Sequence, residues 1–200
     1  RYGIKFGGWV NGGATPNPYI TDGFNGPITF ADQANRAQLN QFNLFVERAV
    51  VTEGKKWDVG FRADFMFGTD AIFTQAYGNP AFDVNYGIAI PQAYAEVYAP
   101  VGNGVNVKVG HFYTPIGYET VPAPNNFFYT HAYTMQYGEP FTHTGVLGNY
   151  HINKNFTAMA GAIGGSGTGG WDGNFDRQMG NWGGIGGITW ASDDKKTSLN

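Results

Sequence analysis

Residues 52–68, TEGKKWDVGFRADFMFG, contain a short polar turn followed by a run of alternating residues. Every second side chain from Trp57 to Phe67 is apolar, and most of the side chains between them are polar or small. A period of two residues predicts a β-strand with one apolar and one polar face. Because a soluble core and a lipid bilayer would both accept the apolar face, this strand alone does not separate the two environments.

The lengths of the connections between strands separate these cases. Long connections rich in Gly, Pro and Asn, at about 12–38, 68–89, 114–140 and 164–181, alternate with short turns at 52–56, 101–104, 153–155 and 192–196. Barrels of the bacterial outer membrane have tight turns on the periplasmic rim and long loops on the outer rim. A soluble β-sandwich has no reason to sort its loops by side. The sequence therefore predicts an all-β, transmembrane, antiparallel up-and-down β-barrel in the bacterial outer membrane.

The composition agrees with this class. Charged residues make up 14% of the chain, whereas a soluble domain usually carries about 25%. No run reaches the 18 or more apolar residues of a spanning helix, so a membrane crossing would have to use strands in a closed sheet. The absence of cysteine excludes thiolate metal sites, cysteine nucleophiles and disulfides. A net charge of −3 without a basic cluster argues against a nucleic-acid partner.

The remaining strands are expected from the same alternation, which weakens toward the C-terminal end, where glycines are frequent. We expect strands at about 2–11, 41–50, 57–68, 92–99, 105–110, 141–152, 155–163 and 182–191, with a ninth beginning near 196. Bacterial barrels have an even number of strands. We therefore interpret residues 1–200 as a single barrel domain, incomplete at its C-terminal end, and as roughly the N-terminal half of a barrel of about 12–18 strands.

The polar faces of these strands supply a candidate pore lining. Its charged members are Lys5, Glu47, Asp58, Arg62, Asp64, Glu96 and Lys108. Such residues could set the ion selectivity of a channel, or each could form a cross-strand ion pair. Arg48 interrupts an apolar face near a short turn, where its long side chain could snorkel to the membrane interface.

One long segment carries a family resemblance. It comprises GHFYTPIGYE at 110–119, PAPNNFFY at 122–129 and the return YGEPFTHTGV at 137–146. Together with Leu39-Asn40-Gln41 and Glu47-Arg48, this segment resembles the OmpL-like β-barrel porins. The resemblance implies a passive outer-membrane pore. Within this segment Glu119 is a candidate constriction residue that could anchor a loop or pair with a wall cation such as Arg62 or Lys108. An inward-folded constriction loop is a further possibility.

Catalytic and metal-binding patterns are weak. The serines are Ser166, Ser192 and Ser198, and none lies in a G-x-S-x-G elbow. His143 and His151 lie about 26 Å apart if they share a strand, too far to share an ion. His131 and His143 are interpreted as loop residues that are solvated or form turns. The glycine-rich stretch 164–170 lacks the Gly-Lys-Ser/Thr of a phosphate loop. The loop aspartates Asp22, Asp70, Asp83, Asp172 and Asp176 match no EF-hand spacing. We predict neither enzymatic activity nor a cofactor.

Two functions from different classes follow. The first is a general porin for small hydrophilic solutes or ions, embedded in outer-membrane lipid and possible as a homotrimer. The second is a structural or surface-interaction barrel whose external loops bind a partner or a surface layer, with Phe127-Phe128-Tyr129 and Trp171 as anchors. A soluble β-sandwich is the third possibility, and it predicts extraction from cells without detergent.

Overall fold

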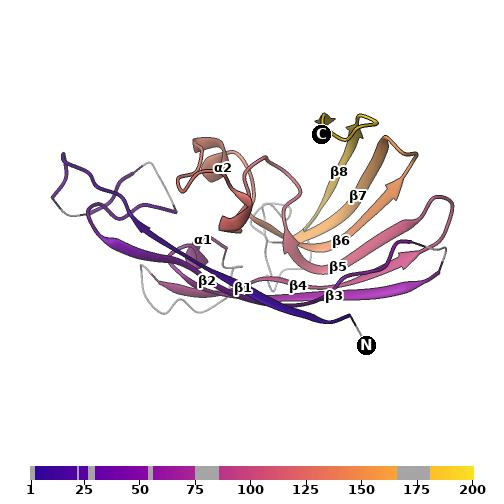
Figure 1. Cartoon of the computed structure of the whole chain (residues 1–200), viewed down its shortest axis with the longest axis horizontal. Coiled ribbons are helices and arrows are strands. Elements are labelled where there is room, and N and C mark those ends of the chain that lie inside the picture. The colour runs from indigo at the N-terminus through magenta and orange to yellow at the C-terminus, as the bar shows by residue number, and fades with distance from the viewer. Residues whose placement is uncertain (1–2, 22, 27–29, 54–55, 75–85, 166–180) are drawn as a thin grey trace.

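The computed structural model describes residues 3–21, 23–26, 30–53, 56–74, 86–165 and 181–200. They form one antiparallel sheet of nine strands, in which each strand pairs with the next along the chain (Figure 1). The strands are β1 (Lys5–Ala14), β2 (Ala37–Arg48), β3 (Asp58–Gly68), β4 (Gly87–Ala99), β5 (Val105–Tyr113), β6 (Thr142–His151), β7 (Phe156–Gly165), β8 (Asn181–Ala191) and β9 (Ser198–Leu199). This order confirms the predicted all-β, up-and-down fold class.

The connections alternate in length as predicted. Those after β2, β4, β6 and β8 are short, whereas those after β1, β3, β5 and β7 are long. The described parts of the long connections contain three short helical elements: α1 (Ala71–Thr74), the 3₁₀ turn η1 (Ala123–Asn125) and α2 (Tyr133–Tyr137). β1 runs three residues beyond its expected end, because its glycine-rich second half shows no apolar alternation.

Two bulges interrupt the ladder near the rim that bears the long connections. Between β1 and β2 the register shifts from Asn11–Gln41 to Gly12–Leu39, which leaves Asn40 without an opposing residue. Between β3 and β4 a second shift occurs between Asp64 and Met66. A bulge inserts an extra residue and redirects the side chains beside it. In β2 this lets the consecutive residues Asn40 and Gln41 both be fully buried.

Two glycines stand where β6 and β7 leave no room for a side chain. A Cβ atom on Gly145 would lie 2.1 Å from the carbonyl oxygen of Ala162, and one on Gly161 would lie 2.3 Å from that of Val146. No other residue fits these positions without a backbone shift. Figure 1 shows β6, β7 and β8 rising at an angle to β1–β4, so that the sheet is a curved trough with α2 on its concave side.

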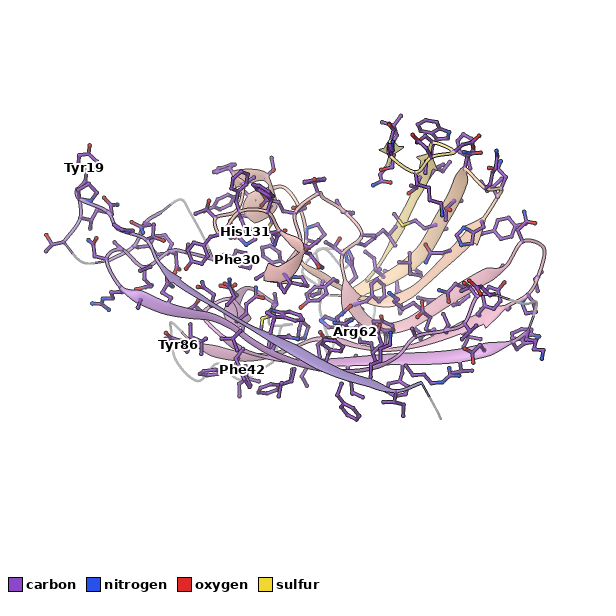
Figure 2. The ribbon with its side chains drawn as sticks, in the orientation of Figure 1. Tyr19, Phe30, Phe42, Arg62, Tyr86 and His131 are labelled. Carbon is purple, nitrogen blue, oxygen red and sulfur yellow. The ribbon has the colours of Figure 1, made fainter. Side chains whose placement is uncertain are left out.

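The two faces of the sheet differ in chemistry. The register places Phe6, Val10, Leu44, Val59 and Ile188 on one face, where Phe6, Val10 and Ile188 are 81%, 70% and 61% exposed. Phe42 shares this face, and Figure 2 shows it pointing away from the concave side. A sandwich would bury such a face against a second sheet. In the described residues this face is open, as expected for a surface that meets lipid.

The main apolar cluster lies on the concave side and is built largely from the long connections. Its buried members are Phe30, Met66, Ala71, Ala89, Val121 and Met135, with Trp9, Tyr113 and Phe141 packed against them. A second, smaller cluster of Phe112, Leu147 and Ile163 lies on β5–β7. The first cluster therefore joins three connections to the wall and does not join two sheets.

Candidate functional site

The seven charged residues predicted to line a pore share one face of β1–β5. The register sets Glu47 opposite both Lys5 and Arg62, and it sets Glu96 opposite Lys108. Asp58 and Asp64 have the same parity as Arg62 on β3. β6–β8 contribute Leu147, Gly161 and Ile185 to the row that contains Lys108. The charge of this face is therefore concentrated on β1–β5.

Arg62 is the centre of the best-connected charged group. Its Nε donates to Asp64 Oδ1 at 2.6 Å, and an Nη lies 3.6 Å from Glu47 Oε1. The guanidinium also lies over the ring of Phe45, 4.3 Å from its centroid. Asp64 accepts further hydrogen bonds from Asn43 and Gln92. These contacts hold the Arg62 charge in one place on the wall.

Glu96 and Lys108 form the next part of this wall. Asn106 Nδ2 donates to Glu96 Oε1 at 2.6 Å. The Lys108 ammonium lies 4.2 Å from the centroid of Tyr94, a cation–π arrangement. Both side chains are thus oriented by a neighbour on the same face.

Asp58 has a structural environment at the opposite rim. It pairs with Arg48 at 2.7 Å and accepts the Val51 amide at 2.7 Å. The ion pair with Asp58 shows what binds the Arg48 guanidinium, and the suggestion that Arg48 snorkels to the membrane interface stays a prediction. The pair ties the end of β2 to the start of β3 across a short turn.

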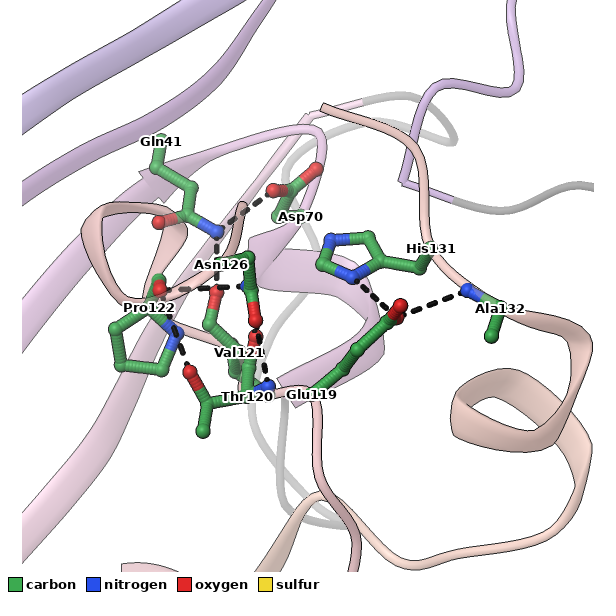
Figure 3. Close-up of polar contacts among 9 residues, drawn as sticks. All are labelled: Gln41, Asp70, Glu119, Thr120, Val121, Pro122, Asn126, His131 and Ala132. Carbon is green, nitrogen blue, oxygen red and sulfur yellow. Dashed lines mark hydrogen bonds and ion pairs between the residues drawn. The ribbon is translucent and has the colours of Figure 1, made fainter. Parts of the chain in front are cut away.

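The long connection between β5 and β6, residues 114–141, folds inward and is held on the concave face by Gln41 (Figure 3). Gln41 Nε2 donates to Val121 O at 2.7 Å, and the Ala123 amide donates to Gln41 Oε1 at 3.0 Å. The same side chain accepts from Trp9 Nε1 at 2.7 Å and donates to Asp70 Oδ2 at 2.8 Å. One buried amide therefore joins β1, β2, the segment after β3 and the β5–β6 loop.

Asn40 and Asp70 extend this anchor. Tyr129 donates its hydroxyl to Asn40 Oδ1 at 2.8 Å, and Asn40 Nδ2 donates to Asp70 Oδ1 at 3.1 Å and to the carbonyl of Phe30. Burial raises the pKa of Asp70 to about 6, against the opposing effect of the hydrogen bonds from Asn40 and Gln41. Asp70 therefore titrates much closer to neutral pH than an exposed aspartate does.

Glu119 anchors the loop internally. Its Oε2 lies 3.1 Å from His131 Nδ1 and accepts the Ala132 amide at 2.9 Å (Figure 3). Burial lowers the pKa of His131, and the contact with Glu119 partly offsets this. The partners of Glu119 are therefore within the loop, and the suggested pairing with Arg62 or Lys108 is not what the structure has.

The histidines differ from expectation. His143 is buried in β6, with its Nε2 3.0 Å from Thr114 Oγ1, and the side chain of His131 is nearly covered. The prediction that both are solvated loop residues is wrong, since the loop packs onto the wall instead of extending into water. Ser166, Trp171 and the loop aspartates Asp22, Asp83, Asp172 and Asp176 lie outside the described residues, as does most of the glycine-rich stretch 164–170.

Within the part of the chain that the structure describes, no group of three or more His, Asp or Glu side chains could hold a metal ion. In the same described residues, no helix combines the length and the apolar character that a membrane crossing needs.

A comparison with protein families places these features in a known group. The model of the family described as putative beta-barrel porin-2, OmpL-like, matches residues 3–200. The chain belongs to this family. Among curated proteins and among solved structures, no match to the chain is found. Membership in this porin family supports a transmembrane β-barrel and implies the outer membrane, with its lipid and with small solutes, as the setting.

The residues that hold the loop of this porin-family chain were not recognised as a site from sequence. Sequence alone places Gln41 on the polar face of a strand, and it gives Asn40, Gln41 and the segment that contains Val121 and Ala123 a resemblance to the family. The structure brings these two stretches into direct contact. Alternation could not reveal the contact, because a bulge makes neighbouring residues of β2 face the same side.

Proposed function

We propose that the chain forms an outer-membrane porin that allows passive diffusion of small hydrophilic solutes or ions, with the β5–β6 loop narrowing the path. The observation that carries this proposal is the inward docking of that loop on the charged concave face, opposite an exposed apolar face. A loop held inside a barrel by buried hydrogen bonds is suited to set the size of a pore.

The charges of the wall support weak ion selectivity. Lys108 and the Arg62 group lie on β3–β5, while the loop contributes the carboxylates Glu119 and Glu139. Charged rings and walls select ions by their local field. A lining with charges of both signs favours passage of small cations and small anions alike. The preference between cations and anions would then depend on single charged side chains.

Planar bilayers test this proposal directly. The folded protein is reconstituted, and its conductance and its reversal potential in a KCl gradient are measured. Lys108→Gln is expected to shift the reversal potential toward cation preference. Lys56→Gln, which removes the same charge from an exposed position next to a short turn, serves as the control and should leave it unchanged. Absence of any conductance from correctly folded protein would contradict the proposal.

A surface-interaction barrel is the second candidate, and the exposed aromatic residues of the loop favour it. Phe127 and Phe128 are 92% and 68% exposed and contact each other edge to face. If they are anchors, Phe127→Ser combined with Phe128→Ser should release a protein that co-purifies from envelopes in detergent, while conductance persists. If no partner is lost, this candidate loses its support.

A further inference from the structure

A cavity of about 290 Å³ lies within the inward-folded loop and was not part of any sequence prediction. Its walls are mostly apolar and include Pro115, Ile116, Val121, Met135 and Phe141. The polar residues that line it include two carboxylates, Glu119 and Glu139. Apolar walls with a few convergent polar groups are the usual composition of a small-molecule site.

The two carboxylates are not equivalent. Glu119 uses one oxygen for His131 and the Ala132 amide. Glu139 makes no hydrogen bond or ion pair with any residue that the structure describes. Its carboxylate occupies the space that a side chain at Gly117 would need, and Gly117 has a left-handed φ of +95° that glycine adopts without strain. Burial, with the nearby charge of Glu119, raises the pKa of Glu139.

Lysine and arginine are absent from the sequence around Glu139. Between Lys108 and Lys154 the sequence contains neither lysine nor arginine. The carboxylate of Glu139 therefore lines the cavity without a partner in the described residues, and a cationic ligand would form a charge-assisted contact with it.

We propose that this cavity binds a small organic cation, namely a primary ammonium group attached to a compact apolar body. The ammonium group pairs with Glu139 and with the unused oxygen of Glu119, and the apolar body lies against Ile116, Met135 and Phe141. Inorganic cations gain little from such walls, and anions are repelled by the two carboxylates. Only the location of this cavity on the solute path rests on the proposed porin function; binding itself does not.

Benzylammonium is a suitable probe, with benzyl alcohol and benzoate as neutral and anionic analogues of similar shape. Binding to the folded, detergent-solubilised protein is measured by ligand-observed NMR and calorimetry at pH 7.5. We expect benzylammonium to bind and the two analogues to bind at least ten times more weakly. Glu139→Gln should weaken benzylammonium about ten-fold, as expected for loss of a charge-assisted contact. Glu53→Gln, the same change at an exposed short turn, should have no effect.

A further measurement keeps this proposal open to refutation if Glu139→Gln folds poorly. Lowering the pH from 7.5 to 4 on the unmodified protein should weaken benzylammonium binding, because Glu139 becomes protonated while the ligand stays charged. Equal binding of benzylammonium and benzyl alcohol, or full binding by a folded Glu139→Gln, would overturn the proposal. Binding without conductance would instead count against the porin, and conductance without binding against this site.

Discussion

The fully buried side chain of Gln41 forms four hydrogen bonds. Attachment of the β5–β6 loop therefore depends on this residue most. Gln41→Leu would leave the Trp9 indole N–H, the Ala123 amide and the Val121 carbonyl without partners. Each unpaired buried group costs about 1–3 kcal/mol. We expect the loop to detach, with faster amide exchange at Ala123 and a larger, noisier single-channel conductance.

Gln38→Leu is the matched control for this change. Gln38 is also buried in β2, but its side chain forms its hydrogen bonds with Asp32 and the Gln33 amide, both in the β1–β2 connection. The control should alter stability without releasing Ala123. Similar exchange at Ala123 in both variants would show that Gln41 has no special role.

Asp70 gives the anchor a pH dependence. Its folded pKa of about 6 exceeds the 3.8 of an unperturbed aspartate, so the folded state binds its proton more tightly. Its contribution to the stability of the docked loop is therefore full below about pH 4, falls as the pH rises to about 6, and stays constant above that. The difference is about 3 kcal/mol by linkage.

The check is amide exchange at Ala123 between pH 4 and 7, corrected for the intrinsic rate. Asp70→Asn should flatten this part of the pH profile, since an amide does not titrate in this range, and should cost about 1 kcal/mol at pH 4 through one mismatched hydrogen bond. His131 and Glu139 titrate in the same loop, so the comparison of the two profiles isolates Asp70. An unchanged profile would contradict the assignment.

Among the elements, β6 and β7 depend on glycine for their close approach. Gly145→Ala places a methyl group against the backbone of β7, which should destabilise the folded barrel by about 1–3 kcal/mol, the usual cost of overpacking. Gly184→Ala in β8 is the control, because a Cβ there meets nothing within 4 Å. Unfolding in urea, followed by tryptophan fluorescence, measures both. Equal stability of the two variants would argue against tight packing at Gly145.

How well a strand can be predicted from sequence depends on how strongly its two faces differ in polarity. β3 was recognised at once because six apolar residues alternate with charged and small ones. In β6–β8 the concave face carries Leu147, Ile163 and Ile185, so both faces are weakly polar and the period fades. The path of the β5–β6 loop could not be predicted, because it depends on a bulge and on side-chain amides that pair with backbone groups about 80 residues away.

For the whole molecule, the decisive question is whether lipid covers the convex face. Leu44 lies on this face and is half exposed. In a soluble protein Leu44→Arg would change stability little, as surface substitutions usually do. In a membrane barrel an arginine facing the bilayer midplane costs about 2–4 kcal/mol.

We expect Leu44→Arg to lower the free energy of unfolding by the amount given for a membrane barrel. Reversible unfolding from lipid vesicles measures this free energy. Asn103→Arg, in the exposed turn between β4 and β5, is the control and should cost much less, since it meets water. A negligible cost at Leu44 would exclude a lipid-facing surface there.

The inward loop also acts as a brace. It leaves the wall at the end of β5, is bound to β1 and β2 through Gln41 and Asn40, and returns at the start of β6. The loop thereby limits, from the concave side, how far the first hairpin and the middle of the sheet can move apart. The contacts that hold the β5–β6 loop in place consequently also set the curvature of this part of the sheet. Loosening the loop would therefore flatten the sheet.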